Sequence, residues 1–275
     1  MISKVATHLN RYDPFLWGPT GHGTGITAVA PVSSDPTLQI WYDGQDPNQF
    51  NPAGTVGTNI TQWTDKSSTA HNAAPIGNAG TRPLVTSSLA TNNKLCLYYD
   101  GGDGLAAPMS SNLASKAGAS IIVVAKANNA TTGMQFIEGT VQSGASYTDA
   151  GGFNIRQLGS TGYRIRMAGS TATTPTAANT NWHIFTIRFD GSGATNADKV
   201  KFYIDGVLQT LTFTVNAGTT TSSTIDSLIF GVDDTKAANF VTGFIGEVLV
   251  YNTTLTDTQQ AATELYLKNK WALSY

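Results

Sequence analysis

The sequence predicts an all-β protein, an antiparallel two-sheet sandwich with an extended N-terminal arm and one short C-terminal helix. About ten short apolar runs alternate with turn signals, the pattern expected of a sandwich. One of these runs, VKFYIDGVLQTLTF (200–213), contains Asp205-Gly206, a strong signal for a two-residue hairpin turn. Helical features are credible only near the C-terminus, so the sheets must supply most of the core.

Residues 1–36 are predicted to form an attachment arm. Tyr12, Phe15, Leu16 and Trp17 offer apolar anchors for other proteins of an assembly. Prolines throughout this segment interrupt any helix or central strand. A strand and loop folded onto the protein's own domain is an equally open interpretation. The sandwich domain is predicted to span residues 37–275.

The predicted strands follow one another from residue 38. In VKFYID, Val200, Phe202 and Ile204 share one face, while Lys201 and Tyr203 share the other, as in a half-buried strand. The remaining runs are LQIWYD (38–43), NKLCLYYD (93–100), SIIVVAKA (120–127), MQFIEG (134–139), GFNIRQL (152–158), YRIRMAG (163–169), NWHIFTIRFD (181–190), SLIFGVD (227–233) and FIGEVLVY (244–251).

The segment LTDTQQAATELYLKNKW predicts the closing helix. Thr256 is placed as its N-cap with Gln259 at the third helical position, which is capping-box spacing. Asp257 favours the positive N-terminal end, and Lys268 and Lys270 favour the negative C-terminal end.

The composition excludes several classes of protein. Charged residues make up 12% of the chain and the net charge is -2, against an average charged fraction of roughly 25%. No basic patch indicates nucleic acid, and no apolar run reaches the length of a membrane span. Cys96 is the one cysteine, which excludes an intrachain disulfide, and its apolar surroundings predict a buried small residue.

A polar but nearly uncharged surface is typical of an outward-facing protein. The N-terminus lacks the apolar region of a secretory signal. Release inside a virus particle is one route outward without such a signal, and non-classical secretion is another. We therefore expect a location on a virion surface, with an extracellular location as the alternative.

Several segments, in order, resemble the laminin-G-like branch of the concanavalin A-like lectin and glucanase superfamily. The resemblance covers about residues 37–273 and rests on the order and spacing of the segments. These are LQIWYDGQDP, ITQWTDKSSTAHNA, RPLV, LYYDGGDGL, NWHIFTIRFDG, VKFYIDGVL and FIGEVLVYNTTLTDTQ. This resemblance implies a two-sheet jelly roll, often with calcium at the rim, and frequently glycan or protein binding.

Calcium is the cofactor to test, although none is required by this interpretation. It needs six to eight oxygen ligands, and Asp-Gly turns offer carboxylates even though such turns also form without metal. The candidate ligands are Asp43, Asp46, Asp100, Asp103, Asp233 and Asp234. Aromatic platforms for glycans are expected from Trp63, Tyr147 and Tyr163.

Catalysis is not expected, and no catalytic residue is assigned. Glucanase relatives carry Glu-x-Asp-x-x-Glu on one strand, and this motif is absent. Glycoside hydrolysis needs two carboxylates flanking the bond, whereas Glu247 stands alone in an apolar strand. We predict that Glu247 is structural and has a hydrogen-bonding or cationic partner.

The sequence thus favours a non-enzymatic virion surface protein of a tailed bacteriophage, either a capsid decoration or a short baseplate or tail component. Its lectin-like domain would adhere to glycans or to a host surface, its arm would contact other virion proteins, and it could form homo-oligomers. Long fibres need a repeat shaft, and no such period is visible. The alternatives are a purely structural capsid cement protein and a cellular carbohydrate-binding module or glycanase.

Overall fold

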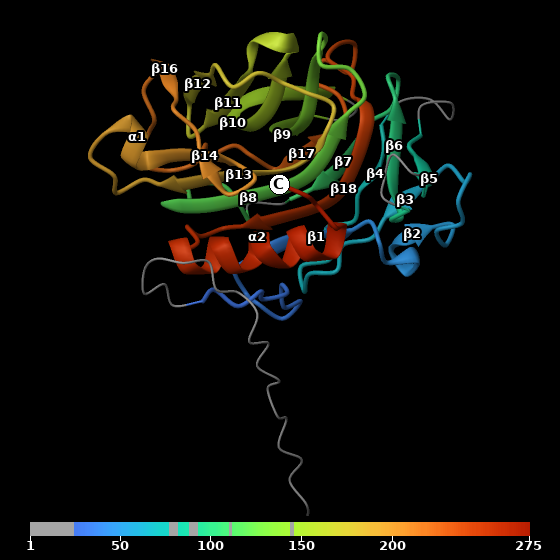
Figure 1. The fold of residues 1–275 in the computed structure, drawn as a ribbon. Coiled ribbons are helices and arrows are strands. Elements are labelled where there is room, and N and C mark those ends of the chain that lie inside the picture. The colour runs from blue at the N-terminus through green and yellow to red at the C-terminus, as the bar shows by residue number, and fades with distance from the viewer. Residues whose placement is uncertain (1–24, 77–81, 88–92, 110–111, 144–145) are drawn as a thin grey trace, which may run out of the picture.

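Two antiparallel sheets packed face to face form the body of the protein (Figure 1). The structure is a computed structural model and describes residues 25–76, 82–87, 93–109, 112–143 and 146–275. The predicted anchors Tyr12, Phe15, Leu16 and Trp17 lie outside the described residues. The prediction of an antiparallel sandwich with one C-terminal helix is confirmed.

The first sheet has eight strands and contains both halves of the Asp205-Gly206 hairpin. Along the sheet the order is β15 (Val207–Leu208), β14 (Val200–Ile204), β13 (Trp182–Asp190), β8 (Gly118–Ala127), β18 (Thr242–Tyr251), β6 (Cys96–Asp100) and β5 (Leu84–Thr86), and β1 (Leu38–Asp43) also pairs with β18.

The second sheet also has eight strands and lies on the far side of the core. Its order is β16 (Thr212–Val215), β12 (Ser170–Thr174), β11 (Tyr163–Met167), β10 (Ser146–Leu158), β9 (Gly133–Ser143), β17 (Ser227–Phe230), β7 (Leu105–Pro108) and β4 (Ala74–Pro75). A small separate ladder joins β2 (Phe50–Asn51) and β3 (Gln62–Trp63).

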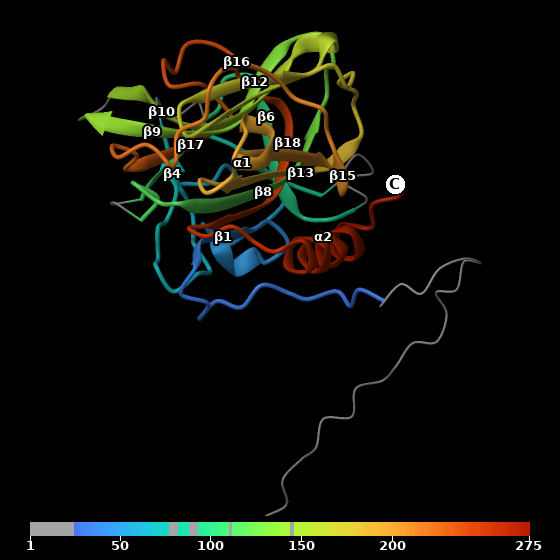
Figure 2. The same cartoon turned by 90° about the vertical axis from the view of Figure 1, so that its left-hand side faces the viewer.

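Two α-helices are present in the described part of the chain, α1 (Asn196–Lys199) and α2 (Asp257–Trp271). Helix α2 begins as predicted, because Thr256 and Gln259 form a reciprocal capping box. It packs on the outer face of the first sheet, opposite the second sheet (Figures 1 and 2). None of the helices in the described ranges is long and apolar enough to cross a membrane.

The core has two layers of apolar contacts. The larger layer lies between the sheets and includes Phe136, Phe185 and Phe202. The smaller layer lies between the first sheet and α2, where Trp271 stacks on Trp182 with ring centroids 5.4 Å apart. Such burial supplies most of the driving force for folding.

Residues 25–36, the described end of the predicted arm, run along this domain. The amide of Val29 donates to the carbonyl of Ala262 in α2 at 3.1 Å, and Ser68 donates its amide to Ser33 at 2.9 Å. Figure 2 shows this segment passing beneath the helix side of the sandwich. This part of the arm therefore contacts its own domain.

Candidate functional site

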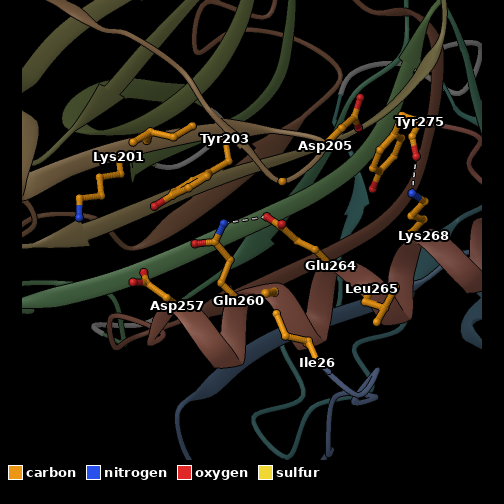
Figure 3. A pocket seen from close by; sticks show the side chains of 13 residues that line it. Ile26, Lys201, Tyr203, Asp205, Asp257, Gln260, Glu264, Leu265, Lys268 and Tyr275 are labelled. Carbon is orange, nitrogen blue, oxygen red and sulfur yellow. Dashed lines mark hydrogen bonds between the residues drawn. The ribbon is translucent and has the colours of Figure 1, made fainter. Parts of the chain in front are cut away.

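A pocket of about 610 Å³ opens between helix α2 and the edge of the first sheet (Figure 3). Strand β14 creates one wall because its alternation turns Lys201 and Tyr203 away from the core. The Asp205-Gly206 turn follows, with φ of 55° and 78°, the left-handed values of a tight hairpin. The lining residues are Ile26, Lys201, Tyr203, Asp205, Gly206, Leu208, Asp257, Gln260, Ala261, Glu264, Leu265, Lys268 and Tyr275.

Glu264 is the buried carboxylate of this pocket, with 6% of its surface exposed. Its Oε1 accepts hydrogen bonds from Thr186 Oγ1 at 2.6 Å and from Gln260 Nε2 at 3.0 Å. Burial raises the pKa of Glu264, and these two hydrogen bonds oppose the rise. A Cβ atom on Gly206 would stand 3.3 Å from Oε2, so the turn closes over this carboxylate.

The other two carboxylates of the pocket, Asp205 and Asp257, have fixed partners. Asp205 accepts from His183 Nδ1 at 2.6 Å and from the amide of Ile184 at 2.8 Å. Asp257 pairs with Arg188, and this hydrogen bond lowers the pKa of Asp257. The walls are therefore polar groups held in defined orientations.

Two tyrosines provide the aromatic surface of the pocket. Tyr203 and Tyr275 lie on either side of Asp205 in the view of Figure 3. Tyr275 is 40% exposed, and its ring lies 4.5 Å from the ammonium of Lys268. Apolar rings beside oriented carboxylates and amides are what a site needs to hold a polyhydroxylated ligand.

Neither Asp43 nor Asp46 fits the predicted calcium site. Lys66 Nζ lies 3.2 Å from Asp43 and 3.3 Å from Asp46, and Lys270 Nζ lies 2.6 Å from Asp43. Lysine ammonium groups therefore already neutralise these carboxylates. No group of three or more His, Cys, Asp or Glu side chains is placed to hold a metal ion in the ranges that the structure describes.

The remaining predicted ligands lie in two separate turns. Asp103 is buried and accepts the amide of Asp100 at 2.9 Å, and burial raises the pKa of Asp103 to about 6. Asp233 accepts from Thr235 and Asn239, both at 2.6 Å. The amide of the neighbouring Asp234 donates to Glu138 Oε2 at 3.1 Å. Calcium at either turn stays a prediction.

The predicted glycan platforms need correction. Trp63 is fully buried and stacks on Tyr42 with ring centroids 5.0 Å apart. Tyr163 is 2% exposed and packs on Phe185 in the core. Neither ring can face a sugar from these positions. The side chain of Tyr147 lies outside what the structure describes.

The prediction that Glu247 has hydrogen-bonding and cationic partners is confirmed. Its two oxygens accept the indole N–H groups of Trp41 and Trp271, both at 2.9 Å. Lys270 Nζ lies 2.7 Å from Oε2. Burial raises the pKa of Glu247, and Lys270 opposes this rise. Glu247 therefore joins strand β18 to helix α2.

Fold and pocket together define a lectin-like β-sandwich domain. The chain belongs to the Concanavalin A-like lectin/glucanases superfamily, whose laminin G family model matches residues 99–259, more than half of its length. No curated protein matches the sequence.

Solved structures show the same fold at low identity. Domain 4 of AbnA, an extracellular arabinanase from Geobacillus stearothermophilus solved with arabinotriose, is 17% identical with a TM-score of 0.57, covering 84% of this chain and 98% of that one. The sialidase of Trypanosoma rangeli is 12% identical with a TM-score of 0.56, covering 90% of this chain. This chain spans only 36% of the sialidase structure.

A third similar structure is botulinum neurotoxin type C, whose cell entry depends on interaction with two ganglioside molecules. It is 12% identical with a TM-score of 0.55, and the match covers 87% of this chain and 52% of that one.

The pocket residues were not predicted as a site. Lys201 and Tyr203 were placed on one face of their strand and Asp205-Gly206 in its turn, but Tyr275 lies 70 residues beyond Asp205 in the sequence. The one available signal was an aromatic and a basic side chain alternating outward beside a hairpin turn.

Proposed function

We propose that this protein binds saccharides, without cleaving them, in the pocket between α2 and the first sheet, and so serves as an adhesion module. The observation that carries the proposal is the combination of Tyr203 and Tyr275 with the oriented groups of Asp205, Gln260 and Glu264 around one hollow. Membership of a lectin and glucanase superfamily supports it.

The chemistry of a sugar matches this set of groups. Its C–H face can pack on an aromatic ring, while its hydroxyls donate to carboxylates and accept from amides and ammonium groups. Asp205 and Glu264 are already held by His183 and Thr186. Little side-chain entropy would then be lost on binding, which favours affinity.

The hydrogen bonds at the two carboxylates support binding over hydrolysis. A glycosidase needs one carboxyl to donate a proton and a second to attack or to activate water. Both oxygens of Asp205 already accept hydrogen bonds, and Glu264 Oε1 accepts two. Incubation with oligosaccharides should release no reducing sugar, and release that Glu264→Gln abolishes would contradict this assignment.

The binding test is calorimetry on saccharides selected by a glycan array. Tyr203→Ala and Tyr275→Ala should each weaken binding about tenfold, because truncating an anchoring aromatic costs more than about 1 kcal/mol. Val215→Ala, an exposed change on β16 of the other sheet, is the matched control. Unchanged affinity in both tyrosine variants would overturn the pocket as the site.

The setting that we propose for this adhesion is a virion surface, with attachment through the N-terminal residues. Support comes from the low charge of the chain and the apolar cluster around Phe15 and Trp17. Deleting residues 1–24 keeps the segment that contacts α2. We expect this deletion to abolish co-sedimentation of the protein with virus particles purified from a culture that produces it. Absence of the full chain from purified particles would contradict the virion setting while leaving saccharide binding intact.

A further inference from the structure

We propose a second binding site on the outer face of the second sheet, where Arg156 and Arg164 hold an oxyanion, either a carboxylate or a sulfate group. This face lies on the side of the sandwich opposite helix α2 (Figure 1). The inference is independent of the saccharide pocket and goes beyond it.

Strand register places the two arginines side by side. Strands β10 and β11 are antiparallel, with Arg156 opposite Arg164 and Asn154 opposite Arg166. The alternate residues Ile155 and Ile165 point into the core. Side chains alternate across a sheet, so the arginines and Asn154 point outward on the same face.

Two like charges directly opposite each other destabilise a sheet. Burial and the neighbouring Arg156 lower the pKa of Arg164. The described contact of Arg156 is with the neutral amide oxygen of Asn239, and neither arginine forms an ion pair with another described residue. The Nε atoms of both arginines are buried without a hydrogen-bond partner. An oxyanion between the guanidinium groups would supply the missing acceptor.

Asn154 is the independent observation that points to a ligand. It is fully buried, and neither its Nδ2 nor its Oδ1 has a hydrogen-bond partner. Its amide is close enough to Glu138 to favour the charged carboxylate, but it does not reach hydrogen-bonding geometry. Leaving such buried polar groups without hydrogen-bond partners is energetically costly. Guanidinium and amide donors together form a strong cradle for a carboxylate or sulfate.

The acidic groups near Arg156 and Arg164 do not occupy these two arginines. Burial and the neighbouring Asp234 raise the pKa of Glu138 to about 7, so this group is partly neutral near physiological pH. Asp233 accepts from Thr235 and Asn239, not from either arginine. Glu138, Asp233 and Asp234 act on Arg164 through longer-range electrostatics and partly offset the fall in its pKa, but none of them forms an ion pair with Arg156 or Arg164 among the described residues.

The experiment is an NMR titration of the full chain with three probes. D-Glucuronate and D-glucose share a ring and differ in a carboxylate, and inorganic sulfate lacks the sugar. We expect glucuronate to bind at least tenfold more tightly than glucose, with shifts at Asn154 and the arginines. Arg156→Gln/Arg164→Gln should abolish this preference, while Tyr203→Ala should keep it.

The controls separate charge from position. Lys94→Gln/Lys116→Gln changes the net charge equally at two loop lysines and should bind glucuronate like the parent protein. If Arg156→Gln/Arg164→Gln fails to fold, Arg164→Lys keeps the charge but removes the planar fork, and should weaken binding at least threefold. Sulfate binding as tight as glucuronate would assign the site to free oxyanions. The proposal would be overturned if the protein bound glucose and glucuronate equally, or if the arginine variants kept the full preference for glucuronate. Neither result would contradict saccharide binding in the pocket.

Discussion

Trp271 donates its indole N–H to Oε2 of Glu247 at 2.9 Å, linking the last residue of helix α2 to the middle of strand β18. Trp41 of β1 donates its indole N–H to the other oxygen of Glu247, and Lys270 forms an ion pair with the carboxylate. The carboxylate is 1% exposed. The carboxylate of Glu247 is therefore shielded from water. A buried carboxylate is stable only when its oxygens are fully hydrogen-bonded or paired with a cation.

We predict that Glu247→Ala lowers the free energy of unfolding by about 3–5 kcal/mol, because it leaves the buried indole N–H groups of Trp41 and Trp271 without an acceptor and removes one of the two carboxylates that pair with Lys270. Urea unfolding followed by tryptophan fluorescence measures this. Asp257→Ala breaks the exposed ion pair with Arg188 and should cost no more than about 1 kcal/mol. Equal stability losses in the two variants would contradict the structural role of Glu247.

The capping box of α2 provides a second test. Thr256 Oγ1 accepts the amide of Gln259, and Gln259 Oε1 accepts the amide of Thr256. Thr256→Ala should lower stability by about 0.5–2 kcal/mol, the usual range for a lost cap. Thr195→Ala removes the equivalent box from α1, a helix of four residues with none buried, and should have a smaller effect on urea unfolding. A larger effect at Thr195 would contradict this ranking.

Structural features that depend only on residues close together in the chain could be predicted from the sequence. The capping of α2 depends on residues three positions apart, and the hairpin at Asp205-Gly206 depends on the conformations of two adjacent residues. Alternation also identified the core faces of Val200, Phe202 and Ile204. These features need no knowledge of how the sheets pack.

The site depended on contacts between distant segments, and sequence reasoning missed it for that reason. Trp63 was predicted as a glycan platform, yet β3 packs it against Tyr42 of the first sheet. Asp43 was predicted as a metal ligand, but it pairs with Lys270, which lies 227 positions away in the sequence. No local pattern brings Tyr275 beside Asp205.

Cys96 offers a test of the apolar layer beneath the helix side of the first sheet. Its thiol is fully buried, and burial raises its pKa far above the ordinary value. We expect no reaction with Ellman's reagent in the native protein and one reactive thiol per chain in urea. The rate in dilute urea should follow the fraction unfolded. Rapid reaction of the native thiol would contradict the packing of β6.

The last prediction concerns pH and the buried Glu138. Its pKa of about 7 in the folded protein exceeds its ordinary value of 4.5, because burial and Asp234 disfavour the charge. The folded state therefore keeps a proton that the unfolded chain releases. The associated stability is fully present below pH 4.5 and is lost as pH rises through 7.

Glu138→Gln removes this titration, since glutamine stays neutral. Relative to Glu138→Gln, the parent protein should lose up to about 3 kcal/mol of unfolding free energy between the two pKa values. Urea unfolding of both proteins from pH 4.5 to pH 8 measures the difference, and Gln142→Glu, which adds a carboxyl at an exposed position of the same strand, should show no such trend. A constant difference between the parent protein and Glu138→Gln across this range would show that Glu138 is charged throughout, and its burial would then require a closer cationic partner than the structure gives it.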